Sequence, residues 1–378
     1  MEADDSKMLP DCEFHSNMSL LDRNDALYTN YQYISTVIIM PILLVTGLIT
    51  NSSFIIMVYR APDMRITINM YLVSLAVSDI LFLISSIGDK IGRYLASPLF
   101  GDAGNRGTAG CIIVIFFINT SLMSSELHIL MLAIERYYSV CVPLTAHINP
   151  RKRAAIILTS TWCVSASLAL SFIPACADYT RVCLWWNSVF VETYSFCLSI
   201  SFQNDIDAAI IYYQITQTFA FFVSVIASNI LYVMVLRHLR RVNVSLQNRG
   251  MAHTSQYRNE QIRQHFNRML CFNGLVYFFL LAPFNIYCLF YFASLINDDK
   301  KLLEPHVTSI LDTTFRLLGY VNSCINPIVY GATNPRYRRA FISAFSVKRR
   351  PTIETISIEK DKSKTTSFTK TKYTTPNL

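Results

Sequence analysis

The chain has 378 residues, of which 52% are hydrophobic and only 15% are charged. Soluble proteins carry about 25% charged residues, so this composition excludes an ordinary soluble domain. Seven long apolar stretches recur, at about 34–59, 67–88, 109–138, 154–176, 208–237, 266–295 and 307–330. Each is close to the ~20 residues that cross a bilayer as a helix. The sequence therefore predicts an all-α membrane protein with seven transmembrane helices.

The charges between the apolar stretches predict the orientation of the chain. Taken together, residues 1–33 and every second connecting segment hold more Asp and Glu than Lys and Arg, whereas Lys and Arg predominate in the others. Because Lys and Arg stay on the cytoplasmic side, we expect the N-terminus outside the plasma membrane. The net charge of +8 then indicates contact with anionic inner-leaflet lipid, and no nucleic-acid partner is expected. The sequon at Asn17 falls on the outer side and could be glycosylated.

The pattern predicts four parts. Residues 1–33 form an outer tail, and residues 34–330 form the seven-helix domain. Residues 331–347 form an amphipathic surface helix, because its aromatic residues recur at helical spacing opposite basic ones. Residues 348–378 are rich in Lys, Ser and Thr, as in a disordered cytoplasmic tail. The longest inner connection, from about 237 to 268, is basic and is expected to be a loop.

Short motifs stand at characteristic places in the apolar stretches. They are GLITN with Asn51, LAVSD ending at Asp79, ERY from Glu135 to Tyr137, Trp162, Pro283, and NPIVY from Asn326 to Tyr330. This set, in this order, resembles the rhodopsin-like G-protein-coupled receptors over roughly residues 33 to 345. The resemblance implies a receptor that activates heterotrimeric G proteins. Since no HExxH pattern and no paired intramembrane aspartates of protease type occur, we expect no enzyme.

The resemblance also implies which residues couple to the G protein. Glu135 would hold Arg136 by a charge-assisted hydrogen bond in the closed bundle, because a charge near the inner membrane face is costly unless paired. On activation Arg136 would meet the G protein, supported by two tyrosines from other helices. The implied coupling set is Glu135, Arg136, Tyr137, Tyr232, Asn326, Pro327 and Tyr330.

A carboxylate halfway through a transmembrane helix is a candidate functional group. In the receptors that this chain resembles, the residue at Asp79 binds a sodium ion, the only cofactor we expect. The matching polar neighbours are Ser125, Asn322, Ser323 and Asn326. The alternative, a protonated Asp79 hydrogen-bonded to Asn326, remains open.

Four positions depart from the pattern of that family. Leu281 stands where Trp is usual, two residues before Pro283, and Ser224, Glu126 and Tyr277 replace apolar residues. We interpret Glu126, Ser224, Tyr277, Leu281 and Pro283 as a polar core switch. In it Glu126, protonated or bonded to Tyr277, exchanges partners as the sixth helix moves, since a lone buried carboxyl is costly. That Glu126 faces a water pocket without switching is the alternative.

The resemblance implies a disulfide between Cys111 and the second outer loop. Cys197 is the better partner by its spacing, and Cys183 is the alternative. Between these two cysteines, RVCLWWNSVFVETYSFCLSIS alternates as a β-hairpin does. Such a lid is similar to that of peptide receptors.

The ligand is constrained by what the pocket positions lack. Ile118 excludes an amine receptor, and the absence of Lys from the seventh stretch excludes an opsin. Acids in the outer loops, such as Asp178 and Asp298, could draw a cationic ligand, although outer loops lack Lys and Arg for insertion reasons in any case. By resemblance the pocket residues are Asn119, Gln214, Gln217, Phe284, Asn285, Asp312, Phe315 and Arg316.

Asp312 and Arg316 are one helical turn apart, so they could form a mutual salt bridge. Alternatively, Asp312 could bind a ligand Arg while Phe315 packs on a neighbouring ring, which would suit an amidated peptide ending in Arg-Phe. The ERYYSVCVPL and NPRYRRAF stretches are also similar to invertebrate FMRFamide-type neuropeptide receptors. We therefore expect a neuropeptide receptor, with receptor kinases and arrestin as inner partners. The alternatives are a lipid or small-molecule chemosensory receptor and, more remotely, a transporter.

Overall fold

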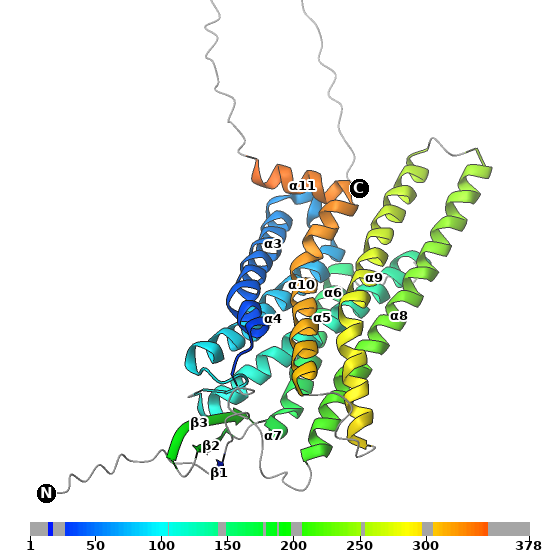
Figure 1. Cartoon of the computed structure of the whole chain (residues 1–378). Helices are drawn as coiled ribbons and strands as arrows, with labels where there is room; N and C mark the ends of the chain where they lie inside the picture. Colours follow the sequence, from blue (N-terminus) through cyan, green and yellow to red (C-terminus); the bar gives the residue numbers. More distant parts are fainter. Residues whose placement is uncertain are drawn as a thin grey trace, which may run out of the picture. The chain divides into compact units, whose positions relative to one another are not determined.

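The computed structural model describes residues 14–17, 27–104, 106–142, 149–176, 179–186, 189–197, 206–250, 254–296 and 305–346. The chain up to Phe345 forms one compact unit. Figure 1 shows this unit as a bundle of long helices, with a small β-sheet at one end and α11 lying across the other.

The helices follow the predicted order. The first span consists of α2 (Asn30–Ile34), a π-helical turn (Ser35–Ile39) and α3 (Met40–Arg60). A 3-10 turn (Pro62–Met64) and the short α7 (Ile173–Cys176) lie between the later helices. The other helices are α4 (Thr67–Ala96), α5 (Gly107–Cys141), α6 (Pro150–Ser171), α8 (Ile206–Asn248), α9 (Ser255–Ile296), α10 (Pro305–Thr333) and α11 (Pro335–Phe345).

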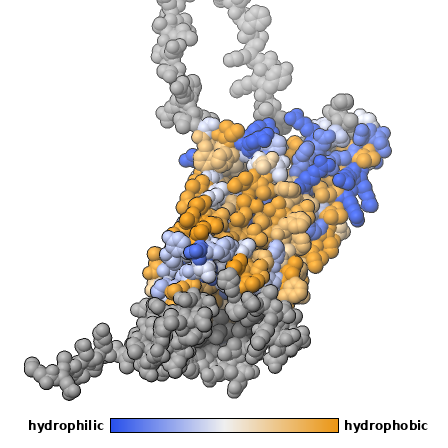
Figure 2. Space-filling model, viewed as in Figure 1, coloured by the Kyte–Doolittle hydropathy of each residue, from blue (hydrophilic) through white to orange (hydrophobic). Residues whose placement is uncertain are grey.

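Within the described residues, six helices are long and apolar enough to cross a membrane. Helix α10 has 29 residues, which is also long enough, but amide and charged side chains interrupt its apolar residues. Asn322, Ser323 and Asn326 of α10 are buried within the bundle, so the polar face of this helix points inward. With α10 the described chain has the predicted seven-helix bundle, whose apolar band is orange in Figure 2.

Helices α8 and α9 are longer than a membrane requires, with 43 and 42 residues. At 1.5 Å per residue each extends over roughly 60 Å, about twice the hydrocarbon thickness. The basic connection from about 237 to 268 is therefore mostly helical, and our expectation of a long loop there is wrong. The hydrophilic ends of this α8–α9 pair are blue in Figure 2. Because their side chains are polar, hydropathy alone could not distinguish a helix outside the membrane from a loop.

The predicted β-hairpin is present, at the end of the bundle that the sequence predicts to face outside. Strands β2 (Tyr179–Trp186) and β3 (Val189–Cys197) pair antiparallel, and β1 (Phe14–Asn17) adds a parallel strand beside β2. The hairpin register brings Tyr179 opposite Cys197. The N-terminal strand was not predicted, since four residues give too short a pattern to recognise.

A glycine allows three helices to approach closely. A Cβ added to Gly47 of α3 would overlap Leu83 Cδ1 of α4 and would lie 2.9 Å from Cys324 Sγ of α10. One turn away, Asn51 Nδ2 donates to the Gly47 carbonyl at 2.9 Å and to the Ser323 carbonyl at 2.8 Å. This contact fixes α10 against α3 and α4, and so it positions the polar residues of α10.

Candidate functional site

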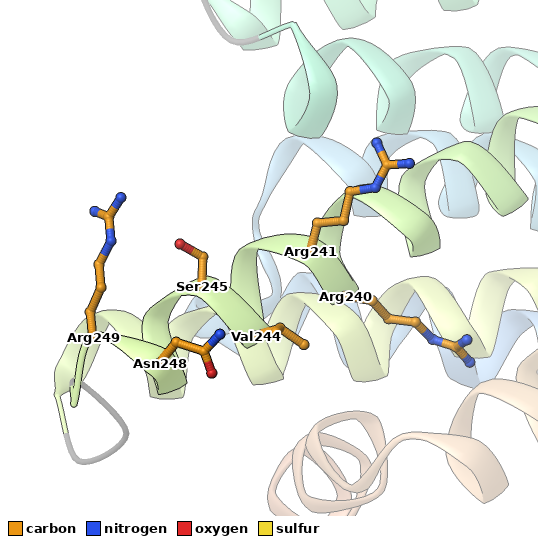
Figure 3. Close-up of a pocket in the computed structure, with 6 residues that line it drawn as sticks. All are labelled: Arg240, Arg241, Val244, Ser245, Asn248 and Arg249. Atoms are coloured by element: carbon orange, nitrogen blue, oxygen red, sulfur yellow. The ribbon is translucent and has the colours of Figure 1, made fainter.

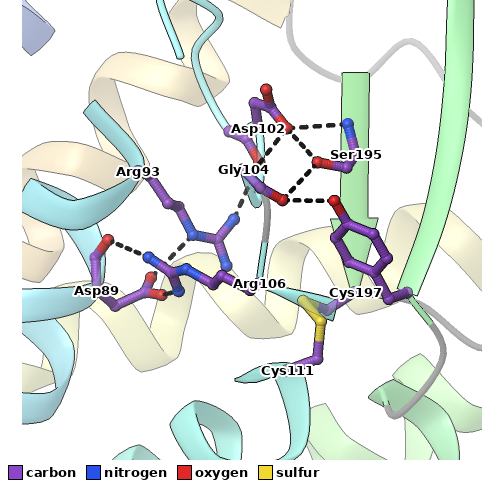
Figure 4. Close-up of a disulfide and its surroundings, with 10 residues drawn as sticks. Asp89, Arg93, Asp102, Gly104, Arg106, Cys111, Ser195 and Cys197 are labelled. Atoms are coloured by element: carbon purple, nitrogen blue, oxygen red, sulfur yellow. Dashed lines mark hydrogen bonds and ion pairs between the residues drawn. A yellow bond between two sulfur atoms is a disulfide. The ribbon is translucent and has the colours of Figure 1, made fainter. Parts of the chain in front are cut away.

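The disulfide joins the hairpin to the third long helix. Cys111 of α5 is bonded to Cys197 of β3, with 5.6 Å between the two Cα atoms (Figure 4). Cys183 is itself disulfide-bonded and does not compete for Cys111. Of the two pairings that the sequence left open, the structure therefore has Cys111–Cys197.

A buried carboxylate beside this disulfide holds the first outer loop on the hairpin. Asp102 Oδ1 accepts hydrogen bonds from Ser195 N at 2.9 Å, Ser195 Oγ at 2.5 Å and Gly104 N at 3.0 Å. Burial alone would raise the pKa of Asp102, but the hydrogen bonds from Ser195, Ser97 and Gly104 outweigh it and lower the pKa below its usual value. This contact could not be predicted from the sequence, because a single loop aspartate carries no pattern.

Asp89 of α4 lies between two guanidinium groups, as Figure 4 shows. Its carboxylate forms ion pairs with Arg93, at 3.0 Å, and with Arg106. Arg106 Nη2 also donates to the Asp89 carbonyl at 2.9 Å, and Arg93 Nη1 donates to the Gly101 carbonyl at 2.9 Å. The outer end of α4 is thereby tied to the loop before α5.

The predicted pocket residues form two groups. In the first, Gln217 Nε2 of α8 donates to Asn119 Oδ1 of α5 at 2.8 Å, and both side chains are buried. Asn285 is buried on α9, where its Nδ2 donates to the Leu281 carbonyl at 3.0 Å. The side chain of Gln214 lies outside the described residues.

The second group lies on α9 and α10. Arg316 Nε pairs with Asp312 Oδ2 at 2.8 Å, so the mutual salt bridge, one of our two interpretations, is formed. The Arg316 guanidinium also lies over the Phe284 ring, at 5.6 Å from its centroid. The rings of Phe315 and Tyr287 are 5.8 Å apart. The loop acids Asp178 and Asp298 lie outside the described residues.

The residues predicted to hold sodium converge on Asp79, which is fully buried. Asn326 Nδ2 donates to Asp79 Oδ2 at 2.8 Å, and Ser125 Oγ donates to Asp79 Oδ1 at 3.4 Å. Among the described residues, Asn322 Oδ1 is buried and has no hydrogen-bond partner. Carboxylate, hydroxyl and amide oxygens are the ligands that a hard cation prefers, so these residues fit a sodium ion.

The positions of the proposed polar switch lie in the middle of the bundle. Glu126, Ser224 and Tyr277 are all buried. Within the described chain, neither Glu126 Oε2 nor the Tyr277 hydroxyl has a hydrogen-bond partner. The Tyr277 ring instead packs near Phe221 at 5.8 Å, in an apolar cluster that includes Leu281. The structure therefore does not contain the Glu126–Tyr277 bond that we considered.

The inner end differs from the expected arrangement. Glu135 Oε1 pairs with Arg153 Nη2 of α6 at 2.7 Å, not with Arg136. Neighbouring side chains on a helix point in directions about 100° apart, which explains why adjacent residues need not pair. The Arg136 guanidinium lies over the Phe266 ring of α9, 4.2 Å from its centroid, and Arg136 Nε has no partner among the described residues.

An aromatic cluster encloses Arg136. Phe266 packs near Tyr337 of α11 at 5.9 Å, and Tyr337 packs near Tyr330 of α10 at 6.1 Å. Tyr337 Oη donates to Asn69 Oδ1 of α4 at 2.5 Å. Tyr232 belongs to the same buried cluster. Of the remaining predicted residues, Pro327 lies inside α10, and the Tyr137 and Tyr138 rings are 5.8 Å apart. In this structure the Phe266 ring therefore covers the Arg136 guanidinium.

A polar chain across three helices was not anticipated. Trp162 Nε1 donates to Ser74 Oγ at 3.0 Å, Ser74 Oγ lies 2.6 Å from His128 Nε2, and His128 Nδ1 lies 2.6 Å from the Ser124 carbonyl. His128 is buried, and both its ring nitrogens have partners. A histidine within an apolar stretch was the signal available in the sequence. This series of polar contacts links α4, α5 and α6.

The inner end of α8 carries a basic hollow of about 530 Å³. Arg240, Arg241 and Arg249 line it together with Val244, Ser245 and Asn248. Figure 3 shows Arg240 and Arg241 projecting from neighbouring positions of the helix and Arg249 projecting at its end.

Comparison with known proteins agrees with this geometry. The family described as 7 transmembrane receptor (rhodopsin family) matches residues 50–330. The thyrotropin-releasing hormone receptor of Mus musculus is 23% identical over 355 residues, covering 89% of this chain and 85% of that protein. The neuromedin-U receptor 2 of Homo sapiens is 25% identical over 328 residues, covering 82% and 71%. The allatostatin-A receptor of Bombyx mori is 24% identical over 304 residues, covering 79% and 75%. The chain belongs to the rhodopsin family of seven-transmembrane receptors.

Proposed function

We propose that this protein is a plasma-membrane receptor, with its N-terminus outside, that binds an extracellular neuropeptide and activates a heterotrimeric G protein. The observation that carries the proposal is the placement of two features at opposite ends of one bundle. At the outer end lies the β2–β3 hairpin, which the Cys111–Cys197 disulfide bonds to α5. At the inner end lies Arg136, whose guanidinium is covered by the Phe266 ring. The relatives are named as receptors for thyrotropin-releasing hormone, neuromedin-U and allatostatin-A. A peptide messenger is the ligand class that these names share.

The outer half of the bundle supports a peptide ligand. The Asn119–Gln217 amide pair offers donors and acceptors that match a peptide backbone, and Phe284 and Phe315 offer aromatic surface. An amidated Arg-Phe end is a narrower proposal. A ligand Arg would have to displace Arg316 from Asp312 to use that carboxylate. Binding of such a peptide should therefore open this salt bridge.

At the inner end, coupling begins when α9 moves Phe266 away from Arg136. The freed guanidinium would then meet the G protein, with Tyr232 and Tyr330 supporting it. Asp79 and its polar neighbours would bind a sodium ion in the closed state. Collapse of this sodium site would favour the open state. Glu126, buried with an unpaired oxygen, would gain a partner when α9 shifts. Receptor kinases and arrestin would act on the tail, and glycosylation would occur at Asn17.

The test is G-protein activation in cells that express the full chain, challenged with a library of neuropeptides in amidated and free-acid forms. An Arg136→Ala variant at matched surface expression serves as the uncoupled control. We expect at least one peptide to activate the intact receptor and to fail on the variant.

A second panel of lipids and small chemosensory ligands tests the alternative function. Activation by that panel alone, with silence from every peptide, would replace the neuropeptide assignment. A response that persists in Arg136→Ala would instead contradict the proposed coupling residue.

A further inference from the structure

The charges of the outer half of the bundle do not balance among the described residues. Asp89 forms ion pairs with both Arg93 and Arg106, which leaves an excess positive charge there, and Asp312 forms an ion pair with Arg316. Asp102 is satisfied by hydrogen bonds from Ser195 and Gly104. Lys90 of α4 is a further cation in this region, and within the described chain it forms no salt bridge or hydrogen bond.

The position of Lys90 is defined by a contact between α4 and α10. One turn inward of Lys90, the Ser86 hydroxyl lies 2.8 Å from the Tyr320 hydroxyl. The two helices run in opposite directions, so one turn outward from this contact places Lys90 on α4 and Arg316 on α10 at the same level. Arg316 and Asp312 are the charged groups that act most strongly on Lys90 from across the interface. Two cations therefore face one carboxylate, and that carboxylate is already bonded to Arg316.

Such an arrangement is electrostatically incomplete. Lys90 is half-buried inside the bundle, where an unpaired ammonium is costly and like charges repel more strongly than in water. An anion between α4 and α10 would offset the repulsion between Lys90 and Arg316. Of the Ser86 and Tyr320 hydroxyls below, the one that accepts their mutual hydrogen bond could donate its own hydrogen to the anion.

We propose that Lys90 is a ligand-binding residue and that it holds a carboxylate of the peptide ligand between α4 and α10. The carboxylate is an Asp or Glu side chain or a free C-terminus. The proposal rests on the proposed function, and it changes the expected ligand chemistry. The acids of the outer loops suggested a cationic ligand, whereas the cation left uncompensated in the described pocket calls for an anionic group. A peptide that carries a cationic and an anionic group would complement both the acids of the outer loops and Lys90.

One arm of the test needs no ligand. Thermal inactivation of the detergent-purified full chain is compared between the unmodified receptor and Lys90→Gln. Because the substitution removes a repulsion, we expect the midpoint to rise by about 1–3 °C. Lys152→Gln, at an exposed lysine on the inner part of α6, is the matched control and should leave the midpoint unchanged. A lower midpoint in Lys90→Gln would mean that Lys90 is already neutralised, which overturns the proposal.

The same arm distinguishes an inorganic anion. The midpoint is measured in sodium chloride and in sodium methanesulfonate at equal ionic strength. If chloride stabilises the unmodified receptor and not Lys90→Gln, the site takes chloride and the peptide assignment is overturned. Equal midpoints in both salts are the expected result.

The second arm uses pairs of synthetic peptides that differ only in one carboxylate, as Glu against Gln, Asp against Asn, or free acid against amide. For the activating peptide we expect the carboxylate form to be about 10- to 100-fold more potent, as for one charge-assisted hydrogen bond. That preference should vanish in Lys90→Gln and persist in Lys90→Arg. Equal potency of both forms on the unmodified receptor would refute only the role of Lys90 and would leave the neuropeptide function standing. Silence of every peptide would refute the neuropeptide function itself, so the two failures are distinguishable.

Discussion

Replacing Phe266 by Leu should raise the activity of the receptor in the absence of ligand. The Phe266 ring lies 4.2 Å from the Arg136 guanidinium, and a cation–π contact in a partly dry site contributes about 0.5–2 kcal/mol. Under the proposed mechanism the contact exists only while the inner end is closed, because the G protein would bind an uncovered Arg136. Its loss should shift the closed-to-open equilibrium by about 2- to 30-fold, since 1.4 kcal/mol corresponds to a factor of ten. Leucine keeps an apolar side chain at the position and removes the π face.

The assay is ligand-independent G-protein activation in cells, normalised to receptor at the cell surface. Phe272→Leu is the matched control, because Phe272 lies on the same helix and is 50% exposed on the lipid-facing side. Phe266→Tyr, which retains an aromatic face, should stay close to the unmodified receptor. Basal activation by Phe266→Leu no higher than that of Phe272→Leu would refute the idea that the ring holds Arg136 closed.

Three further predictions concern stability, measured as thermal inactivation of the purified receptor. Gly47→Ala should destabilise by about 1–3 kcal/mol through overpacking, whereas Gly88→Ala, where a Cβ meets nothing within 4 Å, should be tolerated. Folding lowers the pKa of Asp102, so its charged form stabilises the receptor above the unfolded pKa of about 4. Asp102→Asn should therefore be less stable than the unmodified receptor at pH 7. This difference in stability should shrink as the pH falls through the folded pKa. A difference that grows in acid would contradict this sign. Glu126→Leu should raise the midpoint, since a buried carboxyl oxygen without a partner costs about 1–3 kcal/mol. Glu260→Leu should change little, because the ion pair of Glu260 is to Arg263, whose side chain is 56% exposed.

The architecture could be predicted from the sequence because a membrane imposes a length and an apolar composition on each helix. Helix α10 was recognisable as well, because residues 307–330 hold few charges and end in the NPIVY motif. Beyond the membrane the constraint disappears. The helical ends of α8 and α9 were therefore read as a loop, although they continue to Asn248 and from Ser255.

The candidate site shows a similar division. Sequence motifs brought Asp79, Ser125 and Asn326 together correctly, because these residues are set by their helices at one level of the bundle. The partner of Glu135 could not be predicted, because it depends on how far Arg153 of α6 reaches across to α5. Lys90 was not singled out either. The role proposed for Lys90 depends on which nearby acids are already paired with arginines. That pairing is set by packing rather than by spacing in the sequence.

The length of α9 has a mechanical consequence. Pro283 lies inside the helix, and helices bend most readily at proline. From this residue the outer arm, to Ile296, measures roughly 20 Å, and the inner arm, to Ser255, measures roughly 42 Å at 1.5 Å per residue. A rigid rotation about Pro283 would therefore move the inner tip of α9 about twice as far as its outer end. A ligand that displaces the outer end by one ångström would displace the basic inner tip by about two, so a modest adjustment in the pocket becomes a large opening where the G protein binds.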